Sequence, residues 1–144
     1  MGMSIYFLGA EEEAALVKLG GIMEKADPLD DDDSAFEAFD TFVMERHQGK
    51  VDLTDDLDLA EGYVAFLVDR WIPDFDRPWL TPGEAEAAVV RWQKLVTGKE
   101  LARLLNPARR GAATTDDVTG LHRVFLEAVQ RAAEEQRLLV VLYS

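Results

Sequence analysis

The segment 115–144 constrains the possible fold more than any other part of the chain. Thr115, Asp116 and Asp117 are typical of a helix start, where a hydroxyl and acidic side chains meet unpaired N–H groups and the positive end of the helix dipole. Apolar residues then recur at the i, i+3, i+4 spacing of one helical face: Val118, Leu121, Val124, Phe125, Ala128, Val129 and Ala132. The period changes at 138–143, a continuous apolar run that is too short for another helix and rich in strand formers. This run predicts a strand buried on both faces.

A strand buried on both faces needs neighbouring strands. The only other stretch of this kind is 4–8, Ser-Ile-Tyr-Phe-Leu. We therefore expect an α+β fold, in which a small sheet containing the N- and C-terminal strands packs against about five or six helices. A chain of 144 residues is expected to form one domain, spanning 1–144.

Two helices are expected in the first third of the chain. The segment 10–26 begins with three glutamates, but the pair Gly20-Gly21 weakens the pattern and can break this helix. Its expected apolar stripe is Ala15, Leu19, Ile22, Met23 and Ala26. A capping-box pattern, Ser34 with Glu37, opens the second helix, which ends at Gln48-Gly49. Its expected core face is Phe36, Phe39, Phe42, Val43 and His47.

The middle of the chain is expected to alternate connections with helices. We read 50–58 as an acidic connection, 59–71 as a buried helix and 72–79 as an irregular, proline-containing link. The next helix has the clearest local signal, because Thr81 can cap it, Pro82 suits its first position and Glu84 can bond back to the cap. A short helix is expected at 101–105.

Composition limits the classes of function. The net charge is −13, with 20 acidic and 5 basic residues in the first 76 positions against 8 acidic and 10 basic in the remainder. Such a chain repels phosphates, so we expect neither nucleic acid nor an anionic membrane as a partner, and a basic protein is more plausible. Solubility alone also explains the charge. The absence of cysteine excludes disulfides and thiolate chemistry, and no run is long enough to span a membrane or resembles a signal peptide. A cytoplasmic location is expected.

The candidate binding residues are acidic and aromatic. The acidic ones form two groups that fit no metal-binding loop: Asp30, Asp31, Asp32 and Asp33, and then Asp52, Asp55, Asp56 and Asp58. We expect no metal and no cofactor there, and we interpret the groups as solvated loops or as contacts for a basic partner. Trp71 and Trp79 flank the proline link, where they either line a cleft for a partner or fill the gap between helices.

Catalytic motifs are missing from the sequence. The two histidines, His47 and His122, stand in no paired zinc-binding motif, and no nucleophile elbow or phosphate-binding loop is present. No catalytic residue is therefore assigned. The enzyme alternative is a small hydrolase or a ligand-binding protein that uses either histidine with carboxylates.

Several short motifs resemble those of the YfbM-like family, bacterial proteins of unknown function. The start of the chain is similar, as are Trp79-Leu80-Thr81-Pro82-Gly83-Glu84, Lys99-Glu100-Leu101 with Asn106-Pro107, and the last helix with its strand. The segment 27–76 departs from the family pattern. The resemblance implies an α+β fold and a small bacterial cytoplasmic protein, and it carries over no catalytic residue.

Taken together, these observations favour a non-enzymatic protein-interaction module whose acidic N-terminal half meets a basic partner. One sharper version is an immunity protein that neutralises a toxin, because an acidic surface can occupy a basic nuclease site. The chain is expected to be a monomer or a homodimer, since a small sheet leaves exposed edges.

Overall fold

The computed structural model describes residues 2–25, 34–73, 77–95 and 115–143. The elements follow one another as β1 (Met3–Gly9), a 3-10 turn η1 (Ala10–Glu12), α1 (Glu13–Lys25), α2 (Ser34–Arg46), β2 (Lys50–Thr54), α3 (Leu57–Arg70), β3 (Trp79–Leu80), α4 (Pro82–Leu95), α7 (Thr115–Glu135) and β4 (Arg137–Tyr143). The fold is α+β, as the sequence predicts. The acidic run 30–33 and the expected helix 101–105 lie outside the described residues.

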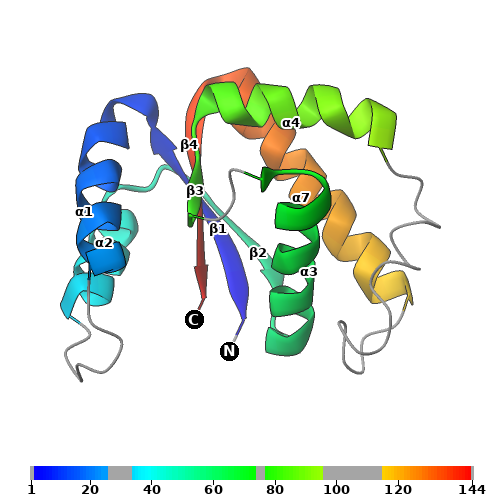
Figure 1. Ribbon diagram of the computed structural model, residues 1–144, viewed down its shortest axis with the longest axis horizontal. Coiled ribbons are helices and arrows are strands. Elements are labelled where there is room, and N and C mark those ends of the chain that lie inside the picture. The colour runs from blue at the N-terminus through cyan, green and yellow to red at the C-terminus, as the bar shows by residue number, and fades with distance from the viewer. Residues whose placement is uncertain (1, 26–33, 74–76, 96–114, 144) are drawn as a thin grey trace.

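The sheet has four antiparallel strands in the order β2-β1-β4-β3. β1 and β4 pair along their whole length, from Met3 opposite Tyr143 to Gly9 opposite Arg137. The two ends of the chain therefore lie side by side in the centre of the sheet (Figure 1). This confirms the prediction from their continuous apolar runs, because a central strand covered on both faces has no polar side to present to water.

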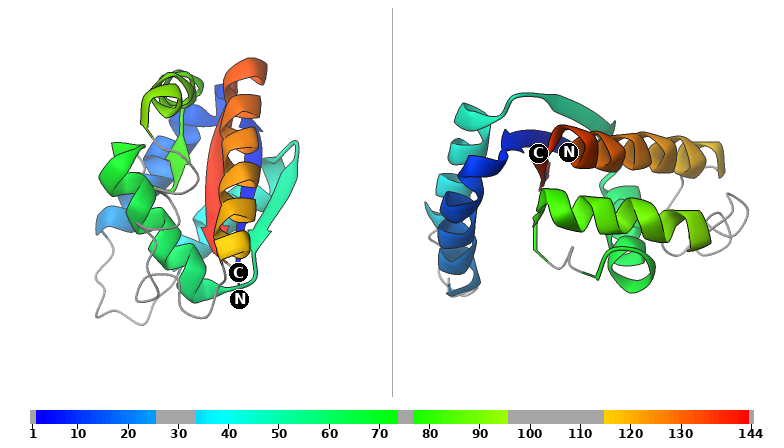
Figure 2. Two further views of the ribbon diagram at one scale, coloured as in Figure 1. Left: turned by 90° about the vertical axis from the view of Figure 1, so that its right-hand side faces the viewer. Right: turned by 90° about the horizontal axis from the view of Figure 1, so that it is seen from above.

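Helices cover both faces of the sheet, which gives three layers (Figures 1 and 2). Because side chains alternate along a strand, Ile5 and Phe7 join the core under α3, α4 and α7, whereas Tyr6 and Leu8 join the core under α1 and α2. β4 alternates in the same way. Within the described residues, no helix is long and apolar enough to cross a membrane.

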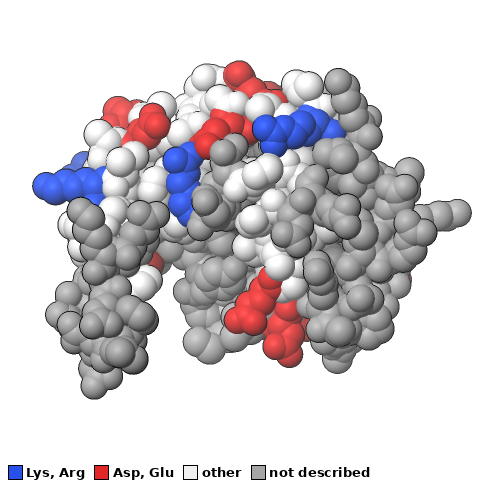
Figure 3. Space-filling view, in the orientation of Figure 1, with Lys and Arg blue, Asp and Glu red and all other residues white. Residues whose placement is uncertain are grey.

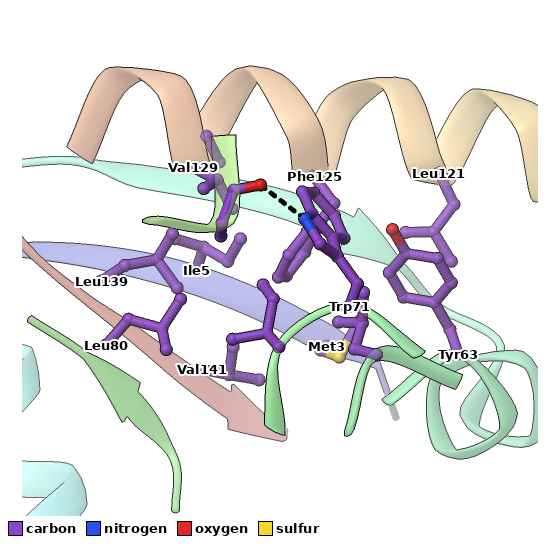
Figure 4. Packing of buried hydrophobic residues seen from close by; sticks show 14 of the residues in the cluster. Met3, Ile5, Tyr63, Trp71, Leu80, Leu121, Phe125, Val129, Leu139 and Val141 are labelled. Carbon is purple, nitrogen blue, oxygen red and sulfur yellow. Dashed lines mark hydrogen bonds between the residues drawn. The ribbon is translucent and has the colours of Figure 1, made fainter. Parts of the chain in front are cut away.

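The larger core is centred on aromatic side chains that tie α3, α4 and α7 together (Figure 4). Trp71 and Phe125 lie with ring centroids 6.0 Å apart, and the Trp71 indole N–H donates a 2.7 Å hydrogen bond to the backbone oxygen of Ala88 in α4. Tyr63 packs edge-on against Phe125 at 5.5 Å. Residues from three helices thus close one cluster, which accounts for the predicted inward face of α7.

The smaller core corrects two details predicted for α1. The helix runs through Gly20-Gly21 without a break, and the stripe is rotated, because Leu16 is fully buried while Ile22 is 48% exposed. The reason is a close approach across the layer. A Cβ on Gly20 would lie 2.5 Å from Cη2 of Trp79, so glycine lets the helix pack directly on that indole ring.

Two strands replace expected connections. Residues 50–54 form β2, where Val51 and Leu53 pack against the larger core while Lys50 and Asp52 point to the other face. Trp79 begins β3, a short edge strand paired with Val140. A further correction concerns α2, where Phe39 and Val43 are buried as expected but Phe36 is 51% exposed.

The predicted cap of α4 is confirmed. The Thr81 N–H donates to Glu84 Oε1 at 2.9 Å, and the Glu84 N–H donates to Thr81 Oγ1 at 3.2 Å. This reciprocal pair satisfies two N–H groups that a helix start leaves open. Arg77 also donates to Glu84 and lies over the Trp79 ring at 4.9 Å, which fixes the approach to the helix.

Candidate functional site

The candidate site is a hollow where the end of β2 meets the first turns of α3 and α7. It has a volume of about 330 Å³ and is lined by Leu53, Thr54, Asp55, Asp56, Leu59, Asp117 and Leu121. Figure 3 shows acidic side chains low in the view, where Figure 1 draws the start of α3, while the upper part of the same face carries both acidic and basic side chains. We call this feature the acidic hollow.

A short turn of fixed geometry forms one wall of the acidic hollow. The Asp56 N–H donates to Thr54 Oγ1 at 3.1 Å, so the last residue of β2 holds the turn. Asp56 then caps α3, because its Oδ1 accepts from the Leu59 N–H at 3.2 Å and its carbonyl accepts from the Ala60 N–H at 2.9 Å. The Asp56 carboxylate is therefore held at the mouth of the helix rather than extended into solvent.

The start of the chain supports this turn from behind. A Cβ on Gly2 would lie 2.3 Å from the Thr54 carbonyl oxygen and 2.9 Å from Asp55 Cα. Both atoms belong to the backbone and cannot move aside as a flexible side chain would. Gly2 thus allows the N-terminus to pass directly under the turn, a role that no sequence pattern indicates.

The floor of the acidic hollow is apolar. Leu59 and Leu121 are 2% and 4% exposed, and Leu53 is partly buried against the same core. Leu59 belongs to α3 and Leu121 to α7, so the floor is the point where these two helices meet the sheet. A ligand seated there would place apolar atoms on leucine side chains.

The rim of the acidic hollow carries three carboxylates, from Asp55, Asp56 and Asp117. The first turns of α3 and α7 each bring a helix N-terminus to the rim, with a partial positive charge of about half an elementary charge. The carboxylate charge exceeds these two contributions, so the rim is negative and attracts a cation rather than an anion. Among the described residues, no group of three or more His, Asp or Glu side chains is placed to hold a metal ion.

The structure places only some of the predicted acidic residues at the acidic hollow. Asp55 and Asp56 line the acidic hollow, whereas Asp58 is exposed on α3 and is not among the lining residues. Asp52 lies on β2 with its side chain 77% exposed, where it accepts a 2.8 Å hydrogen bond from Ser4 Oγ. The run Asp30, Asp31, Asp32 and Asp33 lies outside the described residues.

Sequence reasoning missed Asp117 and the three leucines as site residues. The sequence does mark Asp117 as part of a helix start, which is what brings it to the rim. No sequence signal indicated that this helix start would meet the one at Asp56, some 60 residues earlier. The pairing of α3 with α7 across the core makes that contact.

The two tryptophans proposed as partner contacts are core residues here. Trp71 is 1% exposed and Trp79 is 5% exposed. Trp71 packs among α3, α4 and α7, while Trp79 fills the space between β3, Gly20 of α1 and the Phe39 ring, whose centroid lies 6.1 Å away. In this conformation both rings fill gaps between elements, which was the second interpretation of the pair, and neither faces the acidic hollow.

His122 is likewise a core residue. It is 5% exposed, its Nδ1 lies 2.5 Å from the Tyr63 hydroxyl, and its ring stands within 5.6–6.4 Å of the Tyr63, Phe66 and Trp71 rings. Burial lowers the pKa of His122 to about 4, so the imidazole is neutral near pH 7. Burial also raises the pKa of the Tyr63 hydroxyl well above its usual value, so that it keeps its proton.

His47 lies at the end of α2, away from the lining residues of the acidic hollow. It is half-buried, its backbone N–H donates to the Val43 carbonyl at 2.9 Å, and its ring meets Tyr6 edge-on at 5.0 Å. Neither histidine therefore lines the candidate site.

Comparisons of the chain with models of known protein families, with curated proteins and with solved structures find no match. The resemblance to the YfbM-like family stays a prediction. A function is therefore inferred from the geometry of the acidic hollow and from the charge of the chain.

Proposed function

We propose that this protein is a non-enzymatic interaction module that binds a basic protein partner by accepting a lysine or arginine side chain into the acidic hollow. The observation that carries the proposal is the combination, in one concavity, of three carboxylates on the rim and three leucines on the floor. A long basic side chain matches both parts, because its methylene stem is apolar and its end is cationic.

The size of the acidic hollow agrees with such a ligand. A volume of about 330 Å³ is at the lower limit of the range of roughly 300–1,000 Å³ that is typical of sites for whole small molecules. One extended side chain fits within this volume and leaves room for water or for neighbouring groups of the partner. An arginine can also form paired hydrogen bonds with a carboxylate, which a lysine cannot.

The net charge supports the same kind of partner. With a charge of −13, the protein attracts a basic surface over long range, which increases the association rate at low salt. Asp58, exposed in the first turn of α3, adds negative charge outside the acidic hollow and contributes to this attraction. Asp52 points to the other face of the sheet, beside Lys50. An immunity protein that covers the basic site of a toxin nuclease is the more specific form of the proposal.

The alternative of a small hydrolase has weaker support. That reading requires His47 or His122 in a cleft beside a carboxylate. His122 is instead buried among aromatic rings and has a low pKa, which suits a neutral core residue rather than a general base near pH 7. The observed surroundings of both histidines are those of packed side chains.

A first experiment tests the ligand class directly. The protein, labelled with ¹⁵N, is titrated with N-acetyl-argininamide and, separately, with the matching citrulline amide, which has the same shape without the charge. We expect amide shifts at Asp55, Leu59 and Asp117 with the arginine compound only. Equal shifts with both compounds, or none with either, would refute the proposed ligand class.

A second experiment tests the partner. Tagged protein is used to capture proteins from lysate of the source organism at low and high salt, followed by mass spectrometry. The variant Asp55→Asn/Asp117→Asn is compared with Asp58→Asn/Glu127→Gln, which changes the net charge equally at exposed acids outside the acidic hollow. We expect the first variant alone to lose a stoichiometric basic partner that salt releases. Equal loss in both variants would show that general charge, not the hollow, is responsible.

A further inference from the structure

The free edge of β2 suggests a second binding surface, independent of the acidic hollow. Among the described strands, β2 pairs only with β1, and it stands at the end of the strand order. In both views of Figure 2, β2 is the outermost element on its side and no described helix lies beyond it. An uncovered edge strand presents unpaired N–H and C=O groups to which another strand can bond.

The pairing with β1 determines which residues of β2 point outward. Phe7 uses its own N–H and C=O to bond Gly49 and Gln48, so its backbone groups face β2. Backbone direction alternates along a strand, and Ile5, two residues away, therefore also faces β2 and is opposite Val51. It follows that the backbone N–H and C=O of Val51 point inward to β1, whereas those of Lys50 and Asp52 point to the free edge.

The side chains of these two outward residues have opposite charges and lie on the same face of the sheet. Lys50 lies 5.7 Å over the Tyr6 ring and Asp52 accepts from Ser4, both residues of that face. Lys50 Nζ is 3.3 Å from Asp52 Oδ1, and the side chains are 45% and 77% exposed. The hydrogen bond from Ser4 and then that from Lys50 lower the pKa of Asp52, which keeps it charged.

We propose that the free edge of β2 is a homodimer interface, in which the β2 strands of two copies pair antiparallel about a two-fold axis at Val51. In this register each Lys50 stands opposite Asp52 of the second copy. The backbone groups of both residues point outward, so each Lys50 and the Asp52 opposite it form two hydrogen bonds, N–H to C=O in each direction. The two ion pairs lie on one face, and the sheets of both copies become continuous.

The two neighbouring registers of the same strand pair are disfavoured by like charges. Moving the axis to Lys50 places two lysines opposite each other, and moving it to Asp52 places two aspartates opposite each other, both of which are unfavourable. A charged edge usually prevents pairing, but here the charges alternate so that one self-pairing satisfies them. The bulge between the pairs of Met3 and Ser4 ends the regular edge near Leu53, which keeps the pairing short.

Charge reversal tests the dimer. Lys50→Asp places two carboxylates opposite each other across the interface, and Asp52→Lys places two lysines opposite each other, so we expect each variant to be monomeric. An equimolar mixture of the two variants restores complementary pairs, as does the double variant Lys50→Asp/Asp52→Lys, and both should form dimers. Lys18→Asp and Glu45→Lys are the controls, since they change the charge equally at exposed sites on α1 and α2.

The readout is sedimentation velocity from about 1 µM to about 1 mM protein, a range that covers weak to moderate dissociation constants. Wild-type protein is expected to dimerise in this range, with amide exchange at Lys50 and Asp52 slowing as the concentration rises. A wild type that stays monomeric throughout would overturn the proposal, as would a dimer that both single variants retain. The exchange measurement needs no variant, so it decides the question even where a substitution impairs folding.

Discussion

The contact between Gly20 and Trp79 leads to a prediction with opposite outcomes at two adjacent residues. Alanine is better than glycine in a helix interior by about 1 kcal/mol, so both Gly20→Ala and Gly21→Ala gain this amount from α1. A Cβ at Gly21 has no heavy atom within 4 Å, and we expect this variant to be stabilised by roughly 1 kcal/mol. A Cβ at Gly20 meets the indole of Trp79 at 2.5 and 2.7 Å.

The indole of Trp79 cannot easily move away. Its backbone is paired with β4, its side chain is 5% exposed, and it packs near Phe39. Overpacking of this kind costs about 1–3 kcal/mol, which offsets or exceeds the helical gain. We therefore expect Gly20→Ala to lie between neutral and about 2 kcal/mol destabilised, and to be about 1–3 kcal/mol less stable than Gly21→Ala.

Urea unfolding, followed by circular dichroism, measures both free energies. A double-mutant cycle with Trp79→Phe identifies the cause, because phenylalanine lacks the outer indole atoms that the new Cβ would meet. In that background the penalty for Gly20→Ala should largely disappear. Equal stabilisation of the two alanine variants in the wild-type background would refute the reasoning, since it would show that Trp79 does not press on Gly20.

Two further predictions concern the larger core. Because the pKa of His122 is about 4 in the folded protein and about 6.5 in an unfolded chain, its contribution to stability is complete above pH 6.5 and is lost as the pH falls towards 4, by at most about 3 kcal/mol. In His122→Gln, the side-chain carbonyl can accept from Tyr63, and the unfolding free energy measured by urea titration should depend less on pH between pH 7 and 4 than in the wild type. The same pH dependence in both proteins would contradict the burial argument. Trp71→Phe leaves the buried Ala88 carbonyl without its 2.7 Å donor and opens a cavity, so we expect a loss of about 2–4 kcal/mol. Trp79→Phe removes an indole N–H that bonds no described residue and should cost less, so equal losses would argue against the role of this hydrogen bond.

Local patterns were sufficient to predict most of the elements. The helix α7 and the strand β4 follow from a change of period at 136–138, and the cap of α4 follows from Thr81 and Glu84. These signals are local because helix caps and alternation involve neighbours within a few residues. The pairing of β1 with β4 was predictable for a different reason, since two continuous apolar runs have no other way to bury both faces.

β2 was missed because an edge strand has only one buried face. Val51 and Leu53 alternate with charged residues, and in so short a stretch the acidic character dominated the reading. Whether such a segment is a strand depends on β1 being beside it. The same neighbour determines that Lys50 and Asp52 face outward, on which the proposed dimer depends.

By itself, the sequence determined the fold class, the placement of the terminal strands and the negative charge on which the proposal of a basic partner is based. Only the tertiary structure decided where these charges meet an apolar floor. The acidic hollow joins Asp55 and Asp56 to Asp117, and the glycines at 2 and 20 allow the close approaches on which the layers depend. Such contacts are formed by packing between distant segments, and no periodicity within either segment records them.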